Sequence, residues 1–484
     1  MKRRSFIQKL TAGTSLSVMP VLPFKRDEQD IFNPYLKRPS TIAKALSEEG
    51  YIVVRLAFEG KGIEKITDID GDIEVKNGKL QRLKNYFFEQ GFDELEYVPA
   101  KYQLSVYKND TDIVVLWIDN ATLETSININ QNGKKLRFML GDLLAQPEIK
   151  GEANDYSITA NLLFDKEIGK INPADAGITE SGEKFRFVVM ADPQGGDPEA
   201  TSQDSSTRVK IHNAFIEETI ERVNELEKKP VFSVVIGDFV DSKGQMGNFV
   251  RMKKFYDKLS HPVFLEVGNH ETAYSAKFSP GYYMGDLDNF FTIQKAMNGM
   301  EKILYSFDLG KWHFIVWPDP LRSEFWPTHP HYFDWLERDL EAHRDKPVIF
   351  MQHIPIHPIG INPLINYAES VEVKRMLLDI LSKHDNVKYV FSGHVHMPLK
   401  ASVKTAVTMN GIKFINLPAA GYRPRAFGEE DYYGGPTQGF AYVDIDGNDA
   451  TVYYKNVTRE IYRYPDTFSE FDQGVYPLWL NHKW

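Results

Sequence analysis

Five short polar clusters along the middle of the chain combine carboxylate, amide and imidazole side chains. They are Asp192-Pro193-Gln194, Gly237-Asp238-Phe239-Val240-Asp241, Gly268-Asn269-His270-Glu271, His353 and Gly393-His394-Val395-His396. Oxygen and imidazole groups are ligands of divalent metal ions, and two such ions side by side activate water for hydrolysis. No single cluster supports this conclusion, but together they predict a dinuclear metal site in a metal-activated hydrolase.

The surrounding chain indicates how these clusters are positioned. Each follows an apolar run that is typical of a buried strand, and the runs are Phe185 to Met190, Val231 to Ile236, Val263 to Val267, Val348 to Met351 and Val387 to Phe391. Helix-like periodic stretches alternate with these runs, a pattern that favours an α/β sheet. Ligands of such sheets gather at the carboxyl ends of the strands, so we expect the clusters to meet there.

Taken singly, most of these residues are weak indicators. Asp192 is more often a turn residue or a helix cap, and an isolated His353 is usually a hydrogen-bonded structural histidine. The strongest single signal is the pair His394 and His396, because two imidazoles two positions apart reach neighbouring ions only where the backbone turns. The preceding Gly393 permits such a turn. The prediction therefore depends on the order and the completeness of the set.

In this order the clusters resemble the calcineurin-like metallophosphoesterase superfamily, whose pattern reads D-x-H, G-D-x-x-D, G-N-H-[DE], H and G-H-x-H. The resemblance covers about residues 185–443. It implies an α/β fold built as a four-layer αββα sandwich, with two divalent metal ions about 3.5 to 4 Å apart. Mn²⁺, iron, Zn²⁺ and Mg²⁺ are the candidate ions.

The resemblance also implies which side chains bind each ion. The two donor sets share one carboxylate: Asp192, Asp238 and His396 for the first metal, and Asp238, Asn269, His353 and His394 for the second. An amide oxygen is a neutral hard donor, so ligation by Asn269 leaves the two carboxylates to offset part of the charge of the cations.

The first cluster departs from the family pattern, because Gln194 stands where the more usual member has histidine. A glutamine oxygen can coordinate a metal ion, and some branches of the superfamily resemble this chain in using D-P-Q. The exchange of a strong nitrogen donor for a neutral oxygen shifts the preference toward harder ions such as Mn²⁺, Mg²⁺ or iron, relative to Zn²⁺. We hypothesise a looser first metal. The alternative is that Gln194 only hydrogen-bonds nearby backbone.

The proton chemistry falls to His270, which neighbours the ligand Asn269. Facing the substrate, His270 would donate a proton to the leaving oxygen or stabilise its charge, while a hydroxide activated by the metals attacks phosphorus in line. Glu271 and Asp241 are candidate carboxylates for orienting imidazoles, since a ligating or catalytic histidine needs a partner on its other nitrogen. Their alternative interpretation is surface charge.

The chain before the first cluster has a different pattern. Strand-like runs fill the segment from about Tyr51 to Asp165, where Asn77-Gly78 and Asn132-Gly133 indicate hairpin turns because both residue types tolerate positive φ. No histidine precedes His212, so this part supplies no imidazole ligand. We predict four parts: an export signal and linker (1–27), a β-rich N-terminal domain (28–171), a calcineurin-like phosphoesterase domain (183–443) and a C-terminal strand or tail extension (444–484).

The composition narrows the class of protein. Of the 484 residues, 42% are hydrophobic and 26% are charged, as in an ordinary globular protein. A formal net charge of -10 argues against extended binding to nucleic acid or to an anionic membrane surface. The chain has no cysteine, which excludes disulfides and thiolate metal sites, so any metal ion binds through nitrogen and oxygen.

The first residues resemble a twin-arginine export signal. Arg3 and Arg4 precede a mild apolar stretch from Thr11 to about Pro23. Prolines break this stretch, and it is shorter than the ~20 residues that span a bilayer, so we interpret it as a removable signal and not as a membrane anchor. This interpretation predicts a periplasmic or secreted protein. The alternative is an ordinary basic N-terminus.

These observations favour a metal-dependent phosphoesterase that hydrolyses a phosphate monoester or diester of a small organic molecule. Two alternatives stay open: a non-catalytic phosphate- or metal-binding protein with a weakened first site, and a surface interaction protein in which the N-terminal domain is the working part. Further candidates for contact with the small phosphorylated substrate are His357, Tyr422, Arg423, Arg425 and the Gly434-Gly435 loop, with exposed loop residues as the alternative interpretation. The aromatic segments 317–319 and 325–327 are candidate pocket walls, core packing is their default interpretation, and Asp319 is left unassigned.

Overall fold

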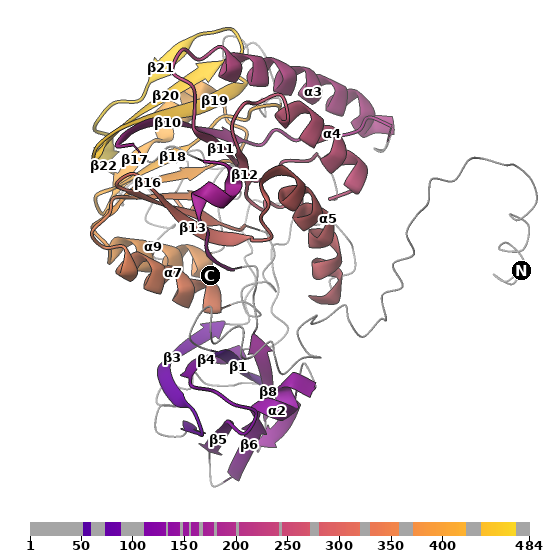
Figure 1. Ribbon diagram of the computed structural model, residues 1–484, viewed down its shortest axis with the longest axis vertical. Helices are drawn as coiled ribbons and strands as arrows, with labels where there is room; N and C mark the ends of the chain where they lie inside the picture. The colour runs from indigo at the N-terminus through magenta and orange to yellow at the C-terminus, as the bar shows by residue number, and fades with distance from the viewer. Residues whose placement is uncertain are drawn as a thin grey trace, which may run out of the picture.

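The structure, a computed structural model, contains a small β-rich domain beside a larger body of sheets and helices (Figure 1). It describes residues 52–59, 73–88, 111–131, 134–145, 149–153, 156–163, 168–178, 182–199, 203–241, 244–271, 280–319, 330–357, 371–422 and 437–470. The predicted export signal at residues 1–27 lies outside these ranges.

Two sheets form the centre of the larger body. The strands of the first are β10 (Lys184–Ala191), β11 (Phe232–Ile236), β12 (Val263–Leu265), β19 (Gly439–Asp446), β20 (Asp449–Asn456) and β21 (Ile461–Arg463). The strands of the second are β9 (Ile168–Lys170), β13 (Leu304–Leu309), β14 (Trp312–Trp317), β15 (Val348–Gln352), β16 (Val387–Ser392), β17 (Val407–Met409), β18 (Ile412–Asn416) and β22 (Ser469–Glu470). Their orders are β12-β11-β10-β19-β20-β21 and β22-β17-β18-β16-β15-β14-β13-β9.

Helices cover the outer face of each sheet. They are α3 (Gln203–Asn224), α4 (Met246–Tyr256), α5 (Pro280–Asn298), α7 (His331–Ala342) and α9 (Val371–Ser382). The short α10 (Leu399–Thr405) packs instead against the core between the sheets, through Leu399 and Val403. In Figure 1, α3 and α4 lie beside β10 and β11, whereas α7 and α9 lie at the opposite side of the body. Apolar residues on these helices, such as Ile220 and Leu377, pack against the outer faces of the sheets and form a hydrophobic core there.

A second core, rich in aromatic residues, lies between the two sheets. Phe187 and Phe232 of the first sheet stack with ring centroids 5.0 Å apart, and Phe307 and Phe314 of the second sheet do the same at 5.0 Å. Because both faces of these strands are buried, their sequences are continuous apolar runs. The predicted fold, a four-layer αββα sandwich with a preceding β-rich domain, is confirmed.

The β-rich domain contains two sheets of its own. Their strands are β1 (Ile52–Glu59), β3 (Lys79–Phe88), β4 (Thr111–Asp119), β7 (Ile149–Ala153) and β8 (Tyr156–Leu163) in the order β3-β4-β1-β8-β7, and β2 (Ile73–Lys76), β5 (Ser126–Gln131) and β6 (Lys134–Met139) in the order β2-β5-β6. The short helix α2 (Leu140–Ala145) follows β6.

The two predicted hairpins differ. β5 and β6 pair antiparallel up to Gln131 and Lys134, as predicted, although Asn132-Gly133 itself lies outside the described residues. Asn77 adopts a φ of 55°, but β2 pairs with β5 while β3 pairs with β4. The Asn77-Gly78 turn therefore joins two sheets and forms no hairpin, because pairing with more distant strands outweighs the local turn preference.

The two bodies pack together through β1, β4 and α7. Alternate residues of β4, Ile113, Val115 and Trp117, share a core with α7, while the residues between them pack inside the β-rich domain. The Trp117 indole Nε1 donates to the Asp334 carboxylate at 3.2 Å, and the Arg338 guanidinium lies 4.5 Å from the Trp117 ring centroid. Removal of the chain before β10 would therefore uncover apolar surface on α7.

The segment at residues 172–178 leads from β9 toward β10. Just before it, β9 pairs parallel with β13 and forms an edge of the eight-stranded sheet. Asn172 caps a short 3₁₀ helix, η5 (Pro173–Ala176), and Ile178 is buried in the core between the sheets. None of the helices within the described ranges combines the length and the apolar character that a membrane crossing requires.

Candidate metal centre and active site

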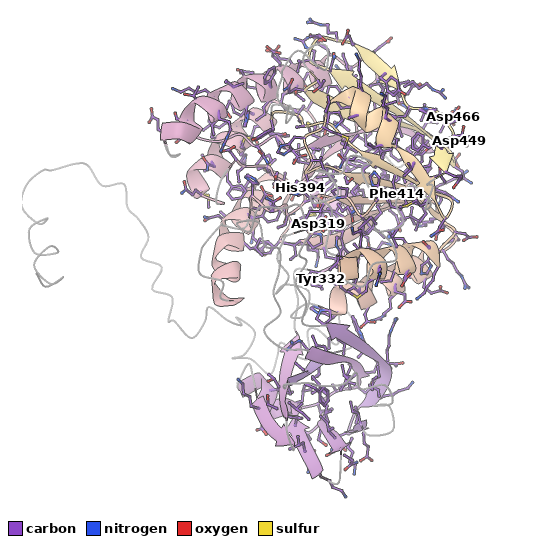
Figure 2. The ribbon with its side chains drawn as sticks, turned by 180° about the vertical axis from the view of Figure 1, so that it is seen from behind. Asp319, Tyr332, His394, Phe414, Asp449 and Asp466 are labelled. Atoms are coloured by element: carbon purple, nitrogen blue, oxygen red, sulfur yellow. The ribbon has the colours of Figure 1, made fainter. Side chains whose placement is uncertain are left out.

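The five predicted clusters lie at the carboxyl ends of strands. Asp192 follows β10, Asp238 follows β11 and His353 follows β15. β10, β11 and β12 run parallel in one sheet, and β15 and β16 run parallel in the other, so their carboxyl ends deliver these residues to one region. The seven predicted metal ligands are called the ligand cluster: Asp192, Gln194, Asp238, Asn269, His353, His394 and His396. Figure 2 shows His394 inside the body, far from the edge that carries Asp449 and Asp466.

The backbone of the ligand cluster is strained. Among the described residues, nine other than glycine have positive φ, and five of them belong to this cluster. They are Asp192 (47°), Gln194 (46°), Asp238 (50°), His394 (69°) and His396 (53°). Few residues other than glycine adopt this conformation, although asparagine, aspartate and histidine do so more often than the rest, and it persists where the surroundings enforce it, as at functional sites.

The turn that separates the two histidines is made by the histidines themselves. His394 and His396 take the positive φ values, whereas Gly393, expected from the sequence to supply the turn, does not. Glycine is required there for space, because a Cβ at Gly393 would lie 2.6 Å from the Asp192 Oδ2 atom. The Asp192 Oδ2 atom also accepts the backbone N–H of His394 at 2.8 Å.

The second group of donors converges on the Nε2 atom of His353. This nitrogen lies 3.0 Å from Asn269 Oδ1, 3.1 Å from His394 Nδ1 and 3.2 Å from Asp238 Oδ1. The other ring nitrogen lies 3.0 Å from the Ile236 carbonyl oxygen, which can only accept, so Nδ1 carries a hydrogen. In a neutral ring Nε2 then presents a lone pair to other acceptors, an arrangement that requires a proton or a metal cation at its centre.

The first group of donors surrounds Gln194. His396 Nε2 lies 3.0 Å from Asp192 Oδ1, and the Gln194 amide nitrogen lies 2.6 Å from Asp238 Oδ2 and 3.2 Å from His396 Nε2. The Gln194 Oε1 atom is buried without a hydrogen-bond partner in the described part of the chain. Amide nitrogen and oxygen exchange places by a simple rotation, which would bring this oxygen to the point where the other donors converge.

The donor spacing fits metal ions. Octahedral oxygen ligands at 2.0 to 2.1 Å from an ion are about 3 Å from their neighbours, and the donors of both groups are 2.6 to 3.2 Å apart. Asp238, His353 and His394 form one set of donor atoms within 4.8 Å of one another, and Asp192, Asp238 and His396 form a second. The two sets share Asp238, as the bridging role predicted for it requires.

The electrostatics of the ligand cluster favour bound positive charge. Burial alone would raise the pKa of Asp238, but the histidines around it, His270, His353 and His394, lower this pKa well below its ordinary value. Burial alone would lower the pKa of His353, but the carboxylates of Asp238 and Asp192 raise it well above its ordinary value. The Asp238 carboxylate is thus ionised at neutral pH and attracts a cation.

His270 stands beside the ligand cluster and is partly exposed. Its side chain is 20% exposed, whereas that of Asp238 is 1% exposed. The ring Nδ1 donates to the backbone carbonyl of Asp241, and Nε2 lies 3.6 Å from Asp238 Oδ2. The carbonyl bond fixes the ring so that Nε2 faces the ligand cluster from the solvent side.

The Glu271 carboxylate accepts hydrogen bonds from the backbone of neighbouring loops. It accepts the N–H groups of Gly268 at 2.7 Å, Asp238 at 2.9 Å and Val240 at 3.1 Å. Burial and the nearby charge of Asp238 raise the pKa of Glu271 to about 8. Glu271 is therefore a buried carboxylate that links the loop of Asp238 to the loop of Gly268 by hydrogen bonds. It is neither a surface charge nor a direct partner of an imidazole.

Asp241 is also buried, and its carboxylate binds Arg208. The Arg208 Nη2 and Nε atoms lie 2.7 Å and 3.1 Å from the two carboxylate oxygens. Asp241 contacts His270 through its backbone carbonyl and not through its carboxylate. Backbone carbonyls thus orient the rings of His270 and His353, a task that the sequence suggested for the carboxylates of Glu271 and Asp241. The Asp241 carboxylate lies near a different imidazole, with its Oδ1 atom 3.7 Å from His212 Nδ1.

Two aromatic rings adjoin the first group of donors. The ring of Tyr422 lies 4.0 Å from the His396 ring and 4.5 Å from the His212 ring, measured between centroids. The sequence pointed to Tyr422 but not to His212, since a histidine on a periodic helix has no distinguishing pattern. By contrast, His357 is buried beside Phe414, and burial lowers its pKa to about 3.

The remaining substrate candidates divide in two. Trp317 is a fully buried core residue, and Asp319 is buried with its Oδ2 accepting the backbone N–H of Ile354 at 2.8 Å. Arg423, Arg425, the Gly434-Gly435 loop and the segment 325–327 lie outside the described residues.

Comparison with known proteins identifies the domain. Residues 185–398 match the family described as Calcineurin-like phosphoesterase. Serine/threonine-protein phosphatase CPPED1 from Rattus norvegicus is 27% identical over 233 residues, which covers 44% of this chain and 69% of the relative. A probable glycerophosphodiester phosphodiesterase, GpdQ, from Arcobacter nitrofigilis is 25% identical over 191 residues, covering 39% of this chain and 64% of the relative.

Two solved structures show limited overall similarity to this chain. A dimetal phosphatase from Danio rerio is 15% identical with a TM-score of 0.42, and the alignment covers 59% of this chain and 99% of that protein. A purple acid phosphatase from yellow lupin (Lupinus luteus) is 13% identical with a TM-score of 0.42, covering 86% of this chain and 69% of that protein. Residues 185–398 are therefore identified as a calcineurin-like phosphoesterase domain, with curated relatives about 25% identical to this chain.

Proposed function

We propose that the chain is a metal-dependent phosphoesterase that hydrolyses a phosphate monoester or diester of a small organic molecule. The observation that carries the proposal is the pair of buried donor sets that share Asp238, with the partly exposed His270 beside them. One group of relatives is named as a phosphatase and another as a probable phosphodiesterase, and both names fit this chemistry.

The ligand cluster supplies seven donors for two ions. Asp192, Gln194, Asp238 and His396 would hold the first, and Asp238, Asn269, His353 and His394 the second. Two divalent ions held in this way stabilise the charge of the phosphoryl oxygens and lower the pKa of a water molecule. The amide oxygens of Gln194 and Asn269 favour harder ions such as Mn²⁺, Mg²⁺ or iron.

Side chains beside the ligand cluster orient the metal donors and deliver a proton to the leaving oxygen. The Asp241 carbonyl accepts the His270 Nδ1 hydrogen, so the doubly protonated His270 ring would deliver its Nε2 hydrogen to the leaving oxygen and return to the neutral form that is protonated at Nδ1. Glu271 holds the loops of Asp238 and Gly268 at a fixed separation, and thereby keeps the donors placed before substrate arrives. Proton delivery of this kind contributes about 10²- to 10⁴-fold to the rate.

The proposal is tested with a panel of phosphate monoesters, diesters and pyrophosphate esters. The purified protein is freed of metal, reloaded separately with Mn²⁺, Fe²⁺, Zn²⁺ or Mg²⁺, and assayed by release of the alcohol and of phosphate. We expect hydrolysis of at least one ester class, with a hard ion giving the highest rate. Folded protein that binds two ions and hydrolyses no member of the panel would favour the non-catalytic binding alternative.

The role of His270 is tested by varying the leaving group. We expect His270→Ala to lower kcat by about 10²-fold or more for an alkyl ester, and much less for a nitrophenyl ester, whose leaving oxygen needs no proton. The matched control is His384→Ala, which removes a histidine near the end of α9 and should leave both rates unchanged. An equal loss on both esters would assign His270 to substrate or metal placement instead of proton transfer.

The proposal includes export. The twin-arginine resemblance at Arg3 and Arg4 supports a periplasmic or secreted location, and export in a folded state would let the metal ions be loaded beforehand. We expect Arg3→Lys combined with Arg4→Lys to leave active enzyme in the cytoplasm, measured by fractionation. Unchanged export of this double variant would contradict the proposed signal.

A further inference from the structure

Helix α3 holds the loop that carries Gln194 through two adjacent side chains. His212 Nδ1 lies 2.9 Å from the Gln194 carbonyl oxygen, which can only accept, so Nδ1 donates. Asn213 brackets Gly196, donating to its carbonyl at 2.8 Å and accepting its N–H at 3.1 Å. Both side chains are buried, at 0% and 7% exposure, so these bonds form away from competing water.

The loop has no room for another conformation. Gln194 is held at a φ of 46°, which its side chain does not favour. A Cβ at Gly195 would lie 2.4 Å from Met252 Sδ and 2.6 Å from Ile216, so the backbone lies directly against α3 and α4. The Gly195 carbonyl accepts the N–H of Asp241 at 2.8 Å. The position of Gln194 is therefore set by the neighbouring elements.

His212 also supports His396, a second donor of the first group. Its ring lies 4.5 Å from the Tyr422 ring, and Tyr422 in turn lies 4.0 Å from the ring of His396. The three rings form a continuous series from α3 to the ligand cluster. His212 thus reaches Gln194 through a hydrogen bond and His396 through the intervening ring of Tyr422.

We infer that His212 is a positioning residue for the first metal position, holding Gln194 by its carbonyl and supporting His396 through Tyr422. This inference rests on the proposed dimetal phosphoesterase function. Each position has one amide donor, but the first has one imidazole where the second has two, and an imidazole is the stronger donor. The first position therefore depends more than the second on donors that are already in place. Residues that orient metal ligands change metal affinity by about 10- to 100-fold when they are replaced.

A pair of substitutions separates the hydrogen bond from the packing. His212→Leu keeps apolar bulk on α3 and removes the donor. His212→Asn keeps an N–H donor, because the asparagine Nδ2 occupies the same place along the side chain as the histidine Nδ1. Each variant is freed of metal, titrated with Mn²⁺ by calorimetry, and analysed for bound metal per chain after gel filtration.

We expect His212→Leu to weaken one of the two Mn²⁺ binding steps by about 10- to 100-fold and to leave the other near its wild-type value. Bound metal per chain should fall from two toward one. His212→Asn should lie closer to the wild type than to His212→Leu in the same step. In activity assays, His212→Leu should need more Mn²⁺ for half-maximal rate and recover most of its kcat at high Mn²⁺ concentration.

The matched control is His261→Leu. His261 is partly buried where His212 is fully buried, but it too is a neutral histidine with one bonded nitrogen, its Nε2 lying 2.6 Å from Ser233 Oγ. Burial lowers its pKa to about 4, as it does for His212. It precedes β12 and so lies at the amino end of the strand, away from the ligand cluster. Both Mn²⁺ steps should be unchanged in this variant.

The outcomes distinguish the two proposals. Two unchanged binding steps in His212→Leu, with a wild type that binds two ions, overturn the positioning role alone. A wild type that binds no divalent ion overturns the proposed function and the positioning role with it. If His212→Leu does not fold, Tyr422→Phe and Tyr422→Leu test the same support: the ring-preserving change should leave the weaker Mn²⁺ step intact, and the ring-removing change should weaken it.

Discussion

Two groups of histidine and aspartate side chains lie at opposite ends of the strands in the eight-stranded sheet. The ligand cluster lies at the carboxyl ends of β15 and β16, whereas a second group lies where β13 ends and β14 begins. We call this second group the His313 cluster, and its members are Lys170, Asp308, His313, Asp339, His343 and Lys346. In both groups three candidate donor atoms lie within 4.8 Å of one another. By residue type alone, both could hold a metal ion.

Lysine distinguishes the two groups. Asp308 Oδ2 lies 2.6 Å from the Lys170 ammonium and 2.8 Å from that of Lys346, so two permanent cations occupy the space that an ion would need. Within the described ranges, the ion pairs of Asp192 and Asp238 are formed with histidines alone. A buried carboxylate group that lacks lysine or arginine must obtain its positive charge from protons or from metal ions.

The largest expected effect is on catalysis. We expect Asp238→Asn to lower kcat/KM by about 10³-fold or more, equivalent to ~4 kcal/mol, because the shared carboxylate of both donor sets is lost. The same exchange at the other end, Asp308→Asn, should keep the wild-type rate at temperatures where the variant is folded. Comparable losses in both variants would show that the two groups are not chemically distinct.

The next effect concerns stability in the presence of metal. Mn²⁺ at about 100 times its dissociation constant should stabilise the wild type by about 2.7 kcal/mol per site against urea, and a chelator should remove this gain. Asp308→Asn should retain the gain, and Asp238→Asn should lose it. The measurement is the urea midpoint with and without metal. A gain that survives in Asp238→Asn would place the bound ion elsewhere, with the His313 cluster as the first candidate.

A smaller effect is expected from Gln194→His. The imidazole restores a nitrogen donor to the first position, so the weaker binding step should tighten by about tenfold and shift its preference toward Zn²⁺ over Mn²⁺. Competition titrations with the two ions measure this change. The control is Gln294→His, the same exchange at a buried glutamine of α5 whose amide donates to the Leu265 carbonyl. An unchanged metal preference in Gln194→His would mean that residue 194 does not contact the ion.

The sequence predicted the parts of this arrangement that follow from local pattern. Continuous apolar runs gave the strands, and the polar residues directly after them gave the ends of β10, β11, β15 and β16. Clustering of the seven donors followed, because parallel strands bring their carboxyl ends together. The resemblance of the motifs supplied the shared role of Asp238, which the two donor sets match.

The parts that depend on tertiary contacts were not predictable. Lys170 and Asp308 are 138 positions apart, and no periodic pattern in the sequence predicts that they form an ion pair. His212 looks like any residue of an amphipathic helix, although it bonds the Gln194 carbonyl. The sequence suggested that Gly393 makes a turn, whereas in the structure it leaves space for Asp192. In each case the deciding atom belongs to a segment far along the chain.

The His313 cluster should also show its own pH dependence. The two ring nitrogens of His313 each lie 2.7 Å from a carboxylate oxygen, one of Asp308 and one of Asp339, so both nitrogens donate and the ring is charged. Burial would lower the pKa of His313, but these two carboxylates raise it above its ordinary value. The remaining charged or titratable groups of the cluster are Lys170, His343 and Lys346.

The smallest predicted effect is therefore a slope of stability with pH. Because the folded state holds the His313 proton more tightly than the unfolded chain, the stabilisation is complete below about pH 6.5 and declines as the pH rises through the folded pKa. The difference in unfolding free energy between the wild type and His313→Gln should then shrink with rising pH, by at most ~1.4 kcal/mol per pH unit. The pKa of His343 is lowered by burial and by the charge of His313, so His343 is neutral in this range. Subtraction of the variant cancels the titration of the ligand cluster, and a difference that is constant from pH 6.5 to 9 would show that His313 carries no extra proton.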